Sequence, residues 1–326
     1  MMFDLGPPAH SRLPFNYQRV PGWLRLALYP LVAGGRGTAE GLEVLQPSWP
    51  IEARVDGYRL GLYQALHEDE DSKQEQSGWP GDAQYPLLMT HDIDTREGMR
   101  RAGAVLDDMV AIGLKPCFFL VGKGYEWDRG FCNAVQQAGG EIALHGDTHD
   151  NRIAYEPPAR IATRLDSCRG LVEEHQIRGF RAPSLLTSDN LYSQLHGRFQ
   201  WDSSVPDTDR DTLVGPRRGC GTVFPFHRAG TLVLPTTMPA DDRLLLLGMR
   251  GLELLDVLRR KWKHVRQLGG LCHFLTHPEP HLFGKQVLRD LYRALLEEIL
   301  DEGDAWITTP SELATHWETL TSEPEP

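Results

Sequence analysis

Residues 85–94 read YPLLMTHDID, an apolar run that ends in two carboxylates. A short apolar run of this kind is typical of a strand that is buried on both faces of a parallel sheet. Asp92 and Asp94 alternate along the end of the run, so both side chains can point the same way. The stretch therefore predicts a buried strand over 86–91 that delivers acidic groups at its carboxyl end.

Downstream of this strand, short apolar runs alternate with longer helical patterns. The further candidate strands are 117–121, 141–145, 178–181, 199–204, 231–236, 271–276 and 305–308. The candidate helices are 97–112, 130–138, 159–175, 187–195, 250–268 and 285–302. Strands that alternate with helices indicate βαβ units around a parallel sheet. We therefore predict an α/β fold, a distorted (β/α) barrel of seven or eight units over residues 85–316.

The segments on either side of the predicted barrel have a different character. Residues 1–84 are rich in Pro and Gly at their start and are interpreted as an N-terminal extension packed on the barrel. Within them, 67–77 is a polar, acidic run of the kind that forms solvated loops. Residues 317–326 are interpreted as a tail.

Composition limits the class of protein. The formal net charge of the 326 residues is -11, whereas a nucleic-acid binder normally carries a basic stripe. The five cysteines are scattered without CxxC spacing, which is typical of buried thiols in a reducing compartment. Because the N-terminus shows no signal-peptide pattern, we expect a cytoplasmic protein. Because the net charge is acidic, we expect no binding to nucleic acid. The sequence gives no indication of the oligomeric state.

The most apolar early stretch, Trp23 to Ala33, contains Arg25 and Pro30 and is too short to span a bilayer. We therefore expect no transmembrane segment. Packing within the protein and contact with a membrane surface both remain open for this stretch.

Functional groups of a (β/α) barrel lie where its strands end, and several predicted strands here end in polar residues. His145 and His149 are four residues apart, the spacing that lets two imidazoles bind one cation from a helical turn. One carboxylate and two imidazoles make a metal site with open positions for water and substrate. A second carboxylate next to the metal could act as a base. The segments 90–94 and 145–149 thus predict a hydrolytic metal site.

Five segments resemble, in order and spacing, the motifs of the polysaccharide deacetylase family, the NodB-homology superfamily. They are Thr90-His91-Asp92-Ile93-Asp94, His145-Gly146-Asp147-Thr148-His149, Arg181-Ala182-Pro183, Trp201-Asp202-Ser203-Ser204 and Leu275-Thr276-His277. The first is like the branch of the family that carries His-Asp-Val-Asp. The resemblance covers roughly residues 85–310 and implies a NodB-type barrel with a divalent metal, most often zinc.

Roles follow from this resemblance position by position. Asp94, His145 and His149 would bind the metal. Asp92 would be the general base and His277 the general acid. The Asp-x-Asp spacing differs from the family's adjacent aspartates, so the roles of Asp92 and Asp94 could be exchanged.

Further residues would support or contact the substrate. Arg181 would orient the base through a charge-assisted contact. Pro183, Ser184, Trp201 and Asp202 would line the substrate site, with the N–H of Ser184 helping to stabilise an oxyanion.

The motifs leave two further questions, one at Gly146 and one about the partner of His277. Gly146 stands where the family has a hydroxyl residue, which weakens a supporting contact. Asp202, Asp241 and Asp242 are all candidates for tuning His277, and the sequence does not choose among them.

The predicted function is removal of an N-acetyl group from an amino sugar in a glycan or glycan precursor. One alternative is metal-dependent hydrolysis of a non-sugar amide or formamide. Another is a catalytically silent glycan-binding module. The intact set of Asp92, Asp94, His145, His149 and His277 favours an enzyme over the binding module.

Overall fold

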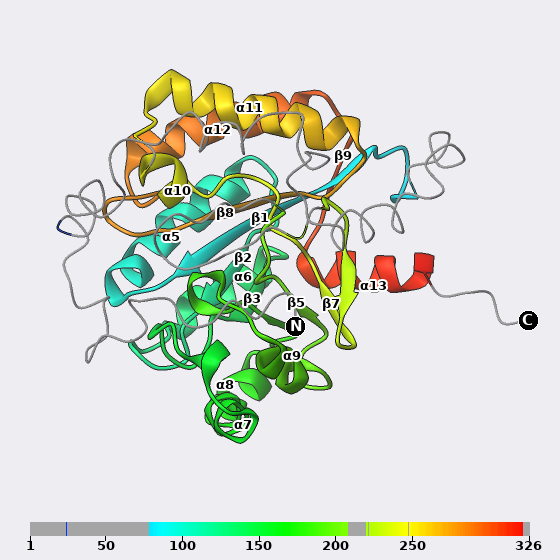
Figure 1. Ribbon diagram of the computed structural model, residues 1–326. Coiled ribbons are helices and arrows are strands. Elements are labelled where there is room, and N and C mark those ends of the chain that lie inside the picture. The colour runs from blue at the N-terminus through cyan, green and yellow to red at the C-terminus, as the bar shows by residue number, and fades with distance from the viewer. Residues whose placement is uncertain (1–23, 25–77, 208–219, 221, 247, 322–326) are drawn as a thin grey trace, which may run out of the picture.

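The computed structural model describes Leu24 and residues 78–207, 220, 222–246 and 248–321 (Figure 1). The acidic loop predicted at 67–77 and nearly all of the N-terminal extension lie outside the described residues. The same holds for the apolar stretch 23–33, apart from Leu24, and for the last five residues of the predicted tail. No helix among the described residues is long and apolar enough to cross a bilayer. All five cysteines are buried.

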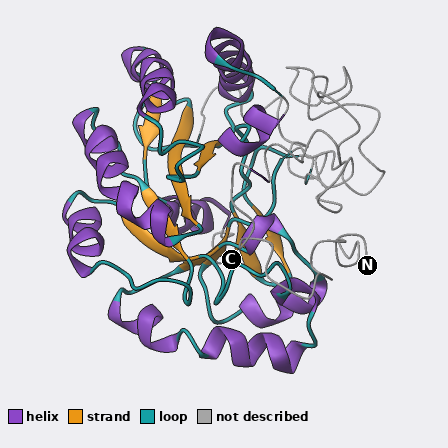
Figure 2. Cartoon of the chain, turned by 90° about the vertical axis from the view of Figure 1, so that its left-hand side faces the viewer, coloured by secondary structure: helices purple, strands orange, loops and turns teal. Residues whose placement is uncertain are grey.

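One curled sheet of nine strands forms the centre of the molecule (Figure 2). The strands are β1 (Tyr85–Ile93), β2 (Cys117–Leu120), β3 (Glu141–Leu144), β4 (Gly179–Phe180), β5 (Trp201–Asp202), β6 (Phe226–Arg228), β7 (Thr231–Val233), β8 (Cys272–Thr276) and β9 (Ala305–Ile307). Their order is β6-β7-β5-β4-β3-β2-β1-β8, and β9 pairs with β1. The pairing of β6 with β7 is antiparallel, whereas the other strand pairs are parallel.

The segment that follows β7 reaches the other edge of the sheet. There the backbone N–H groups of Thr237 and Met238 donate to the carbonyl of His273 in β8, at 3.3 and 3.0 Å. The ring is thus completed by a short irregular segment instead of a full strand ladder. The predicted distorted (β/α) barrel is confirmed.

Helices surround the sheet (Figure 2). They are α5 (Arg96–Ala111), α6 (Arg129–Gln137), α7 (Pro158–Asp166), α8 (Arg169–Glu174), α9 (Asp189–Leu195), α10 (Asp241–Leu246), α11 (Gly251–Gln267), α12 (Gln286–Asp301) and α13 (Pro310–Thr321), with short 3-10 turns η3 (Ile153–Tyr155) and η4 (Pro183–Leu185). Thr95 starts α5 directly after the acidic end of β1, because its side chain accepts from the N–H groups of Glu97 and Gly98.

Several element boundaries differ from the sequence prediction. The helix predicted over 159–175 is two helices, α7 and α8. At their junction the Ser167 hydroxyl donates to the carbonyl of Arg164 at 2.5 Å, a local bond that competes with helix continuation. Strand β6 and helices α10 and α13 were not predicted. Helix α13 runs to Thr321, so the tail predicted from residue 317 begins inside this helix.

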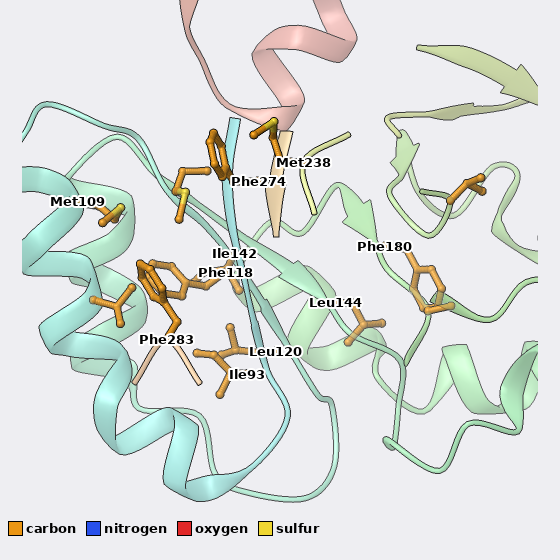
Figure 3. Packing of buried hydrophobic residues seen from close by; sticks show 14 of the residues in the cluster. Ile93, Met109, Phe118, Leu120, Ile142, Leu144, Phe180, Met238, Phe274 and Phe283 are labelled. Atoms are coloured by element: carbon orange, nitrogen blue, oxygen red, sulfur yellow. The ribbon is translucent and has the colours of Figure 1, made fainter. Parts of the chain in front are cut away.

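The core has two parts, one on each side of the sheet. Ile93, Phe118 and Leu120 lie on the outer face, which α5 covers (Figure 3). Inside the barrel, Leu88, Phe119 and Trp201 pack with residues of α13 and close one end. Such layers of side chains fill the interior of (β/α) barrels. Polar groups line the other end of the barrel, where the parallel strands finish.

Candidate active site

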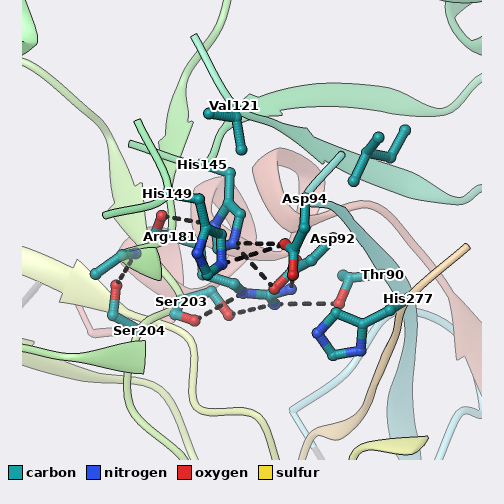
Figure 4. A network of polar contacts seen from close by, with 12 residues as sticks. Thr90, Asp92, Asp94, Val121, His145, His149, Arg181, Ser203, Ser204 and His277 are labelled. Carbon is teal, nitrogen blue, oxygen red and sulfur yellow. Dashed lines mark hydrogen bonds and ion pairs between the residues drawn. The ribbon is translucent and has the colours of Figure 1, made fainter. Parts of the chain in front are cut away.

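Three potential metal ligands come together at the carboxyl ends of β1 and β3. The Oδ1 atom of Asp94 lies 3.4 Å from Nε2 of His145 and 3.3 Å from Nε2 of His149 (Figure 4). The three ligand atoms all lie within 4.8 Å of one another. A carboxylate with two imidazoles is a donor set suited to zinc or a similar divalent ion. The sequence-predicted ligands therefore converge on one point.

The protonation states around this point also suit a cation. Although burial acts in the opposite direction, the imidazoles of His149 and His145 hold the pKa of Asp94 well below its usual range. The Nδ1 atom of His145 lies 3.0 Å from the carbonyl oxygen of Arg181. If this nitrogen carries the proton, Nε2 keeps its lone pair for a metal. The residues present thus fit a divalent metal.

The two histidines are not held as the sequence predicted. Residues 145 and 146 are irregular and 147–151 form a series of bends after β3, so His145 and His149 do not share a helical turn. The four-residue spacing correctly paired the two imidazoles, but the loop's own contacts set their geometry.

The second aspartate has a different partner. The Nη1 atom of Arg181 donates to Oδ1 of Asp92 at 2.6 Å, so the predicted contact between these residues is present. Burial opposes ionisation of Asp92, but the Arg181 guanidinium keeps the pKa of this carboxyl below its usual value. Its Oδ2 lies 3.6 Å from Nε2 of His145. Asp92 is therefore an ionised carboxylate next to the three potential ligands, and Asp94 is the better placed of the two to bind the ion.

Arg181 is itself fixed from several sides, and its side chain is fully buried. It donates to the Ser203 carbonyl at 2.9 Å and to the Ser203 hydroxyl at 2.8 Å. Its guanidinium lies over the ring of Phe119, with Cζ 3.8 Å from the ring centroid. Nη2 is also 3.1 Å from Nε2 of His273, a buried imidazole whose pKa is lowered by burial and by this cation. These contacts hold the guanidinium in one position under Asp92.

His277 follows β8 and lies on the Asp92–Asp94 side of the group, away from His145 and His149 (Figure 4). Its Nδ1 is 2.7 Å from Oδ1 of Asp241, and its backbone N–H donates to Oδ2 of the same residue at 3.1 Å. Burial acts to lower the pKa of His277, but the charge and hydrogen bond of Asp241 raise it well above its usual value. Of the three aspartates that the sequence left open, Asp241 is the partner.

No family model matches this chain. A segment of 142 residues is 30% identical to the peptidoglycan deacetylase-like protein FGM2 of Gibberella zeae, and it spans 41% of this chain and 41% of that protein.

Two crystal structures have the same fold. One is a probable polysaccharide deacetylase from Pseudomonas aeruginosa PAO1, and the other is PuuE allantoinase. Each is 16% identical, covers 76% of this chain and 95% of its own, and has a TM-score of 0.60. This chain has the polysaccharide deacetylase fold. The predicted resemblance is confirmed, while the assignment to the His-Asp-Val-Asp branch stays a prediction.

In this barrel, the predicted substrate residues Pro183 and Ser184 begin η4 shortly after Arg181. Ser184 and Leu185 both have φ of 56°, in the left-handed region that side chains rarely adopt. Such backbone conformations persist where the surroundings enforce them, often near functional sites. The ring of Pro183 packs on Gly146, where an added Cβ would lie 2.9 Å from it, and Gly146 has φ of +68°. The departure from the deacetylase motif at Gly146 therefore has a steric cause.

The predicted substrate contacts of Trp201 and Asp202 are wrong. Trp201 opens β5, is fully buried in the closed end of the barrel, and donates from Nε1 to Ser311 of α13 at 3.0 Å. Asp202 is fully buried and accepts from the Tyr192 hydroxyl at 2.6 Å and the Ser204 hydroxyl at 2.5 Å. The Ser204 hydroxyl in turn accepts from the N–H of Ala182 at 2.7 Å. Asp202 thus supports the backbone beside Arg181 and does not face a substrate.

Sequence reasoning missed two charged groups around the site. Glu279 accepts from the backbone N–H and the hydroxyl of Thr95, at 3.0 and 2.6 Å, and so ties the segment after Asp94 to the segment after His277. Arg164 of α7 contacts the loop that carries His149. Neither residue belongs to a recognisable motif, so the sequence offered no signal for them.

Proposed function

We propose that this protein is a metal-dependent hydrolase that removes an N-acetyl group from an amino sugar in a glycan or glycan precursor. The observation that carries the proposal is the convergence of Asp94, His145 and His149 next to a carboxylate tied to Arg181 and an imidazole tied to Asp241. The name of the Gibberella zeae relative supports a glycan substrate. We also propose a cytoplasmic location, which the burial of all five cysteines supports.

Asp94, His145 and His149 would hold the ion, and zinc is the metal that we propose for this donor set. When bound, it supplies Lewis acidity toward the amide carbonyl and the attacking water.

Asp92 would take the proton from the attacking water. Its ionised state at neutral pH supports this role, because a base must be deprotonated before it can act. Arg181 cannot lose its proton in the accessible pH range, so it keeps Asp92 ionised and in place without competing for that proton. Arg181 therefore acts through Asp92 and need not touch the substrate.

His277 would give a proton to the nitrogen as the C–N bond breaks, since an amine is a very poor leaving group as an anion. Asp241 holds the Nδ1 side of the ring and favours the protonated form, which leaves the Nε2 proton for the substrate. The products are acetate and a sugar amine. The strained backbone at Ser184 supports the proposal that its N–H assists the developing oxyanion.

A second candidate function is hydrolysis of a non-sugar amide by the same groups. It is favoured by the fold likeness to PuuE allantoinase, whose TM-score of 0.60 equals that of the deacetylase structure. The polar groups described above act on an amide in either case, so the substrate itself must separate the two functions.

The test combines metal analysis of the purified protein with product release from a panel of substrates. The panel contains N-acetylated amino sugars, chitin and peptidoglycan fragments, formamides and cyclic amides. Acetate release from the sugars, lost in Asp94→Ala, is the expected result. Turnover of only the non-sugar amides would support the second candidate. No turnover with added zinc or cobalt, together with glycan binding that Asp94→Ala leaves unchanged, would instead support a binding module.

A further inference from the structure

Arg164 is a buried cation that none of the proposed catalytic steps uses. It lies on α7 at the edge of the barrel (Figure 1) and is only 8% exposed. Its Nε donates to Asp147 at 2.7 Å, and its Nη2 donates to the Thr148 hydroxyl at 2.8 Å and to Asp150 at 2.9 Å. Its Nη1 donates to Glu156 at 2.9 Å. One guanidinium therefore binds three residues of a single loop and one residue beyond it.

The loop that Arg164 binds carries one of the potential metal ligands. Thr148 and Asp150 are the immediate neighbours of His149 on either side, so the contacts of Arg164 bracket this histidine. The loop consists of bends and includes Gly146 in the left-handed region, so no helical turn sets the position of His149. A rigid, planar group with several donors can hold such a loop in one conformation.

His145 is positioned differently. Its backbone N–H donates to the carbonyl of Leu120 in the neighbouring strand at 2.8 Å, and its Nδ1 lies 3.0 Å from the Arg181 carbonyl. The sheet itself thus fixes His145, whereas His149 lies four residues farther along the loop. Of the two histidines, His149 is the one whose immediate neighbours in the chain contact Arg164.

The electrostatics make this arrangement sensitive to substitution. Asp147 is only 5% exposed, and its carboxylate meets both Nε and Nη2 of Arg164, at 2.7 and 2.6 Å. Removing the cation from a buried pair leaves a charge without compensation, which strongly favours rearrangement of the segment that carries it. Asp150 and Glu156 would add to the repulsion, because they share the same cation.

We propose that Arg164 is a positioning residue that holds His149 in the geometry required for metal binding. The inference rests on the proposed metal centre but not on the identity of the substrate.

The test measures zinc affinity, by competition with a chromophoric chelator, for the wild type, Arg164→Gln and Arg160→Gln. Arg160 is the matched control, because it lies on the same helix and pairs with Glu156 at 3.2 Å, while its side chain is 68% exposed. We expect Arg164→Gln to bind zinc roughly 10- to 100-fold more weakly, the usual effect of losing a partner that orients a ligand. Arg160→Gln should bind zinc as the wild type does. The absorption spectrum of the cobalt-substituted protein should change in Arg164→Gln only.

A purely structural role for Arg164 would give a different pattern. The metal-free variant would then melt at a lower temperature, but its folded fraction would bind zinc with wild-type affinity and show an unchanged cobalt spectrum, which would overturn the proposal. If Arg164→Gln does not fold, Thr148→Val removes one contact next to His149, and unchanged affinity there would also overturn it.

Failure of the positioning role of Arg164 can be distinguished from failure of the proposed hydrolase function. Wild-type protein that binds zinc but hydrolyses no amide would refute the hydrolase and leave the affinity comparison intact. Wild-type protein that binds no zinc would overturn the positioning role together with the metal centre.

Discussion

Replacing Asp241 by Asn should shift the pH dependence of the enzyme. The substitution keeps the shape of the side chain and an oxygen near Nδ1 of His277, but it removes the negative charge 2.7 Å from that nitrogen. The buried imidazolium then loses the group that opposes the effect of its burial, so the pKa of His277 should fall.

The size of the effect can be worked from the geometry. Two unit charges about 4 Å apart interact by about 4 kcal/mol at an effective dielectric constant of about 20, which is an upper bound because the amide dipole and the surroundings compensate in part. If the imidazolium of His277 loses half of that energy, its protonated fraction falls by up to roughly 30-fold at pH values above its wild-type pKa, since each 1.36 kcal/mol is tenfold. The value of kcat/KM should fall by the same factor in that pH range.

The direction of the shift in the pH profile follows from the role of His277 as an acid. An acid must be protonated in the free enzyme, so activity is present below the pKa of His277 and is lost as the pH rises through it. In Asp241→Asn the alkaline limb of the profile of kcat/KM against pH should therefore move to lower pH. Because the pKa of Asp92 lies below its usual value, an acid limb due to this carboxylate would lie below the pH range of the assay, and the test rests on the alkaline limb alone.

The assay is acetate release from an N-acetylated sugar substrate over about pH 5 to 9.5, with zinc content measured for each variant. Asp242→Asn is the matched control, because Asp242 also raises the pKa of His277 but contributes less than Asp241. An alkaline limb that does not move in Asp241→Asn, with zinc content unchanged, would refute His277 as the general acid.

Three further predictions concern other parts of the site. Chelation of the metal should abolish amide hydrolysis, and added zinc should restore it; activity that survives in metal-free protein would contradict the role of Asp94, His145 and His149. Gly146→Ser should lower the free energy of unfolding by about 1–3 kcal/mol in urea titrations, since φ is +68° and the new Cβ would meet Pro183; an increase in stability would show that the loop relaxes readily. Trp201→Phe should destabilise the fold by about 1–3 kcal/mol without changing KM, because the indole packs in the closed end of the barrel; a raised KM would restore Trp201 as a substrate contact.

The barrel could be predicted because its strands are unusual in sequence. A strand buried on both faces, such as β1, is apolar almost throughout and stands out from the helices around it. Parallel strands end at one edge, so Asp94 after β1 and His145 after β3 could be expected to meet there. Strand β6 was missed because its three residues, Phe226–Arg228, form an antiparallel edge with no apolar run.

The buried position of Trp201 could not be predicted from the sequence in the same way. The motif around it suggested a site residue, but the position of a side chain along the barrel axis decides what it contacts. Trp201 opens β5, one layer below the strand ends, and Gly179 in β4 leaves the room that its ring fills. Asp241 was undecided for a related reason: its contact with His277 spans 36 residues, and only the folded chain determines which carboxylate reaches the imidazole.

The division of labour between Asp92 and His277 follows from the partner that each group has. Asp92 with Arg181 and Asp241 with His277 are both pairs of a buried carboxylate and a cationic group. The guanidinium of an arginine keeps its proton at every accessible pH, whereas an imidazolium can release it. The first pair leaves a carboxylate that can accept a proton, and the second leaves an imidazolium that can donate one. Environments that push two groups in opposite directions are how a site assigns an acid and a base at the same pH. Because the difference lies in Arg181 and Asp241 and not in the reacting groups, substitutions at these two positions should change the pH profile on opposite sides of its maximum.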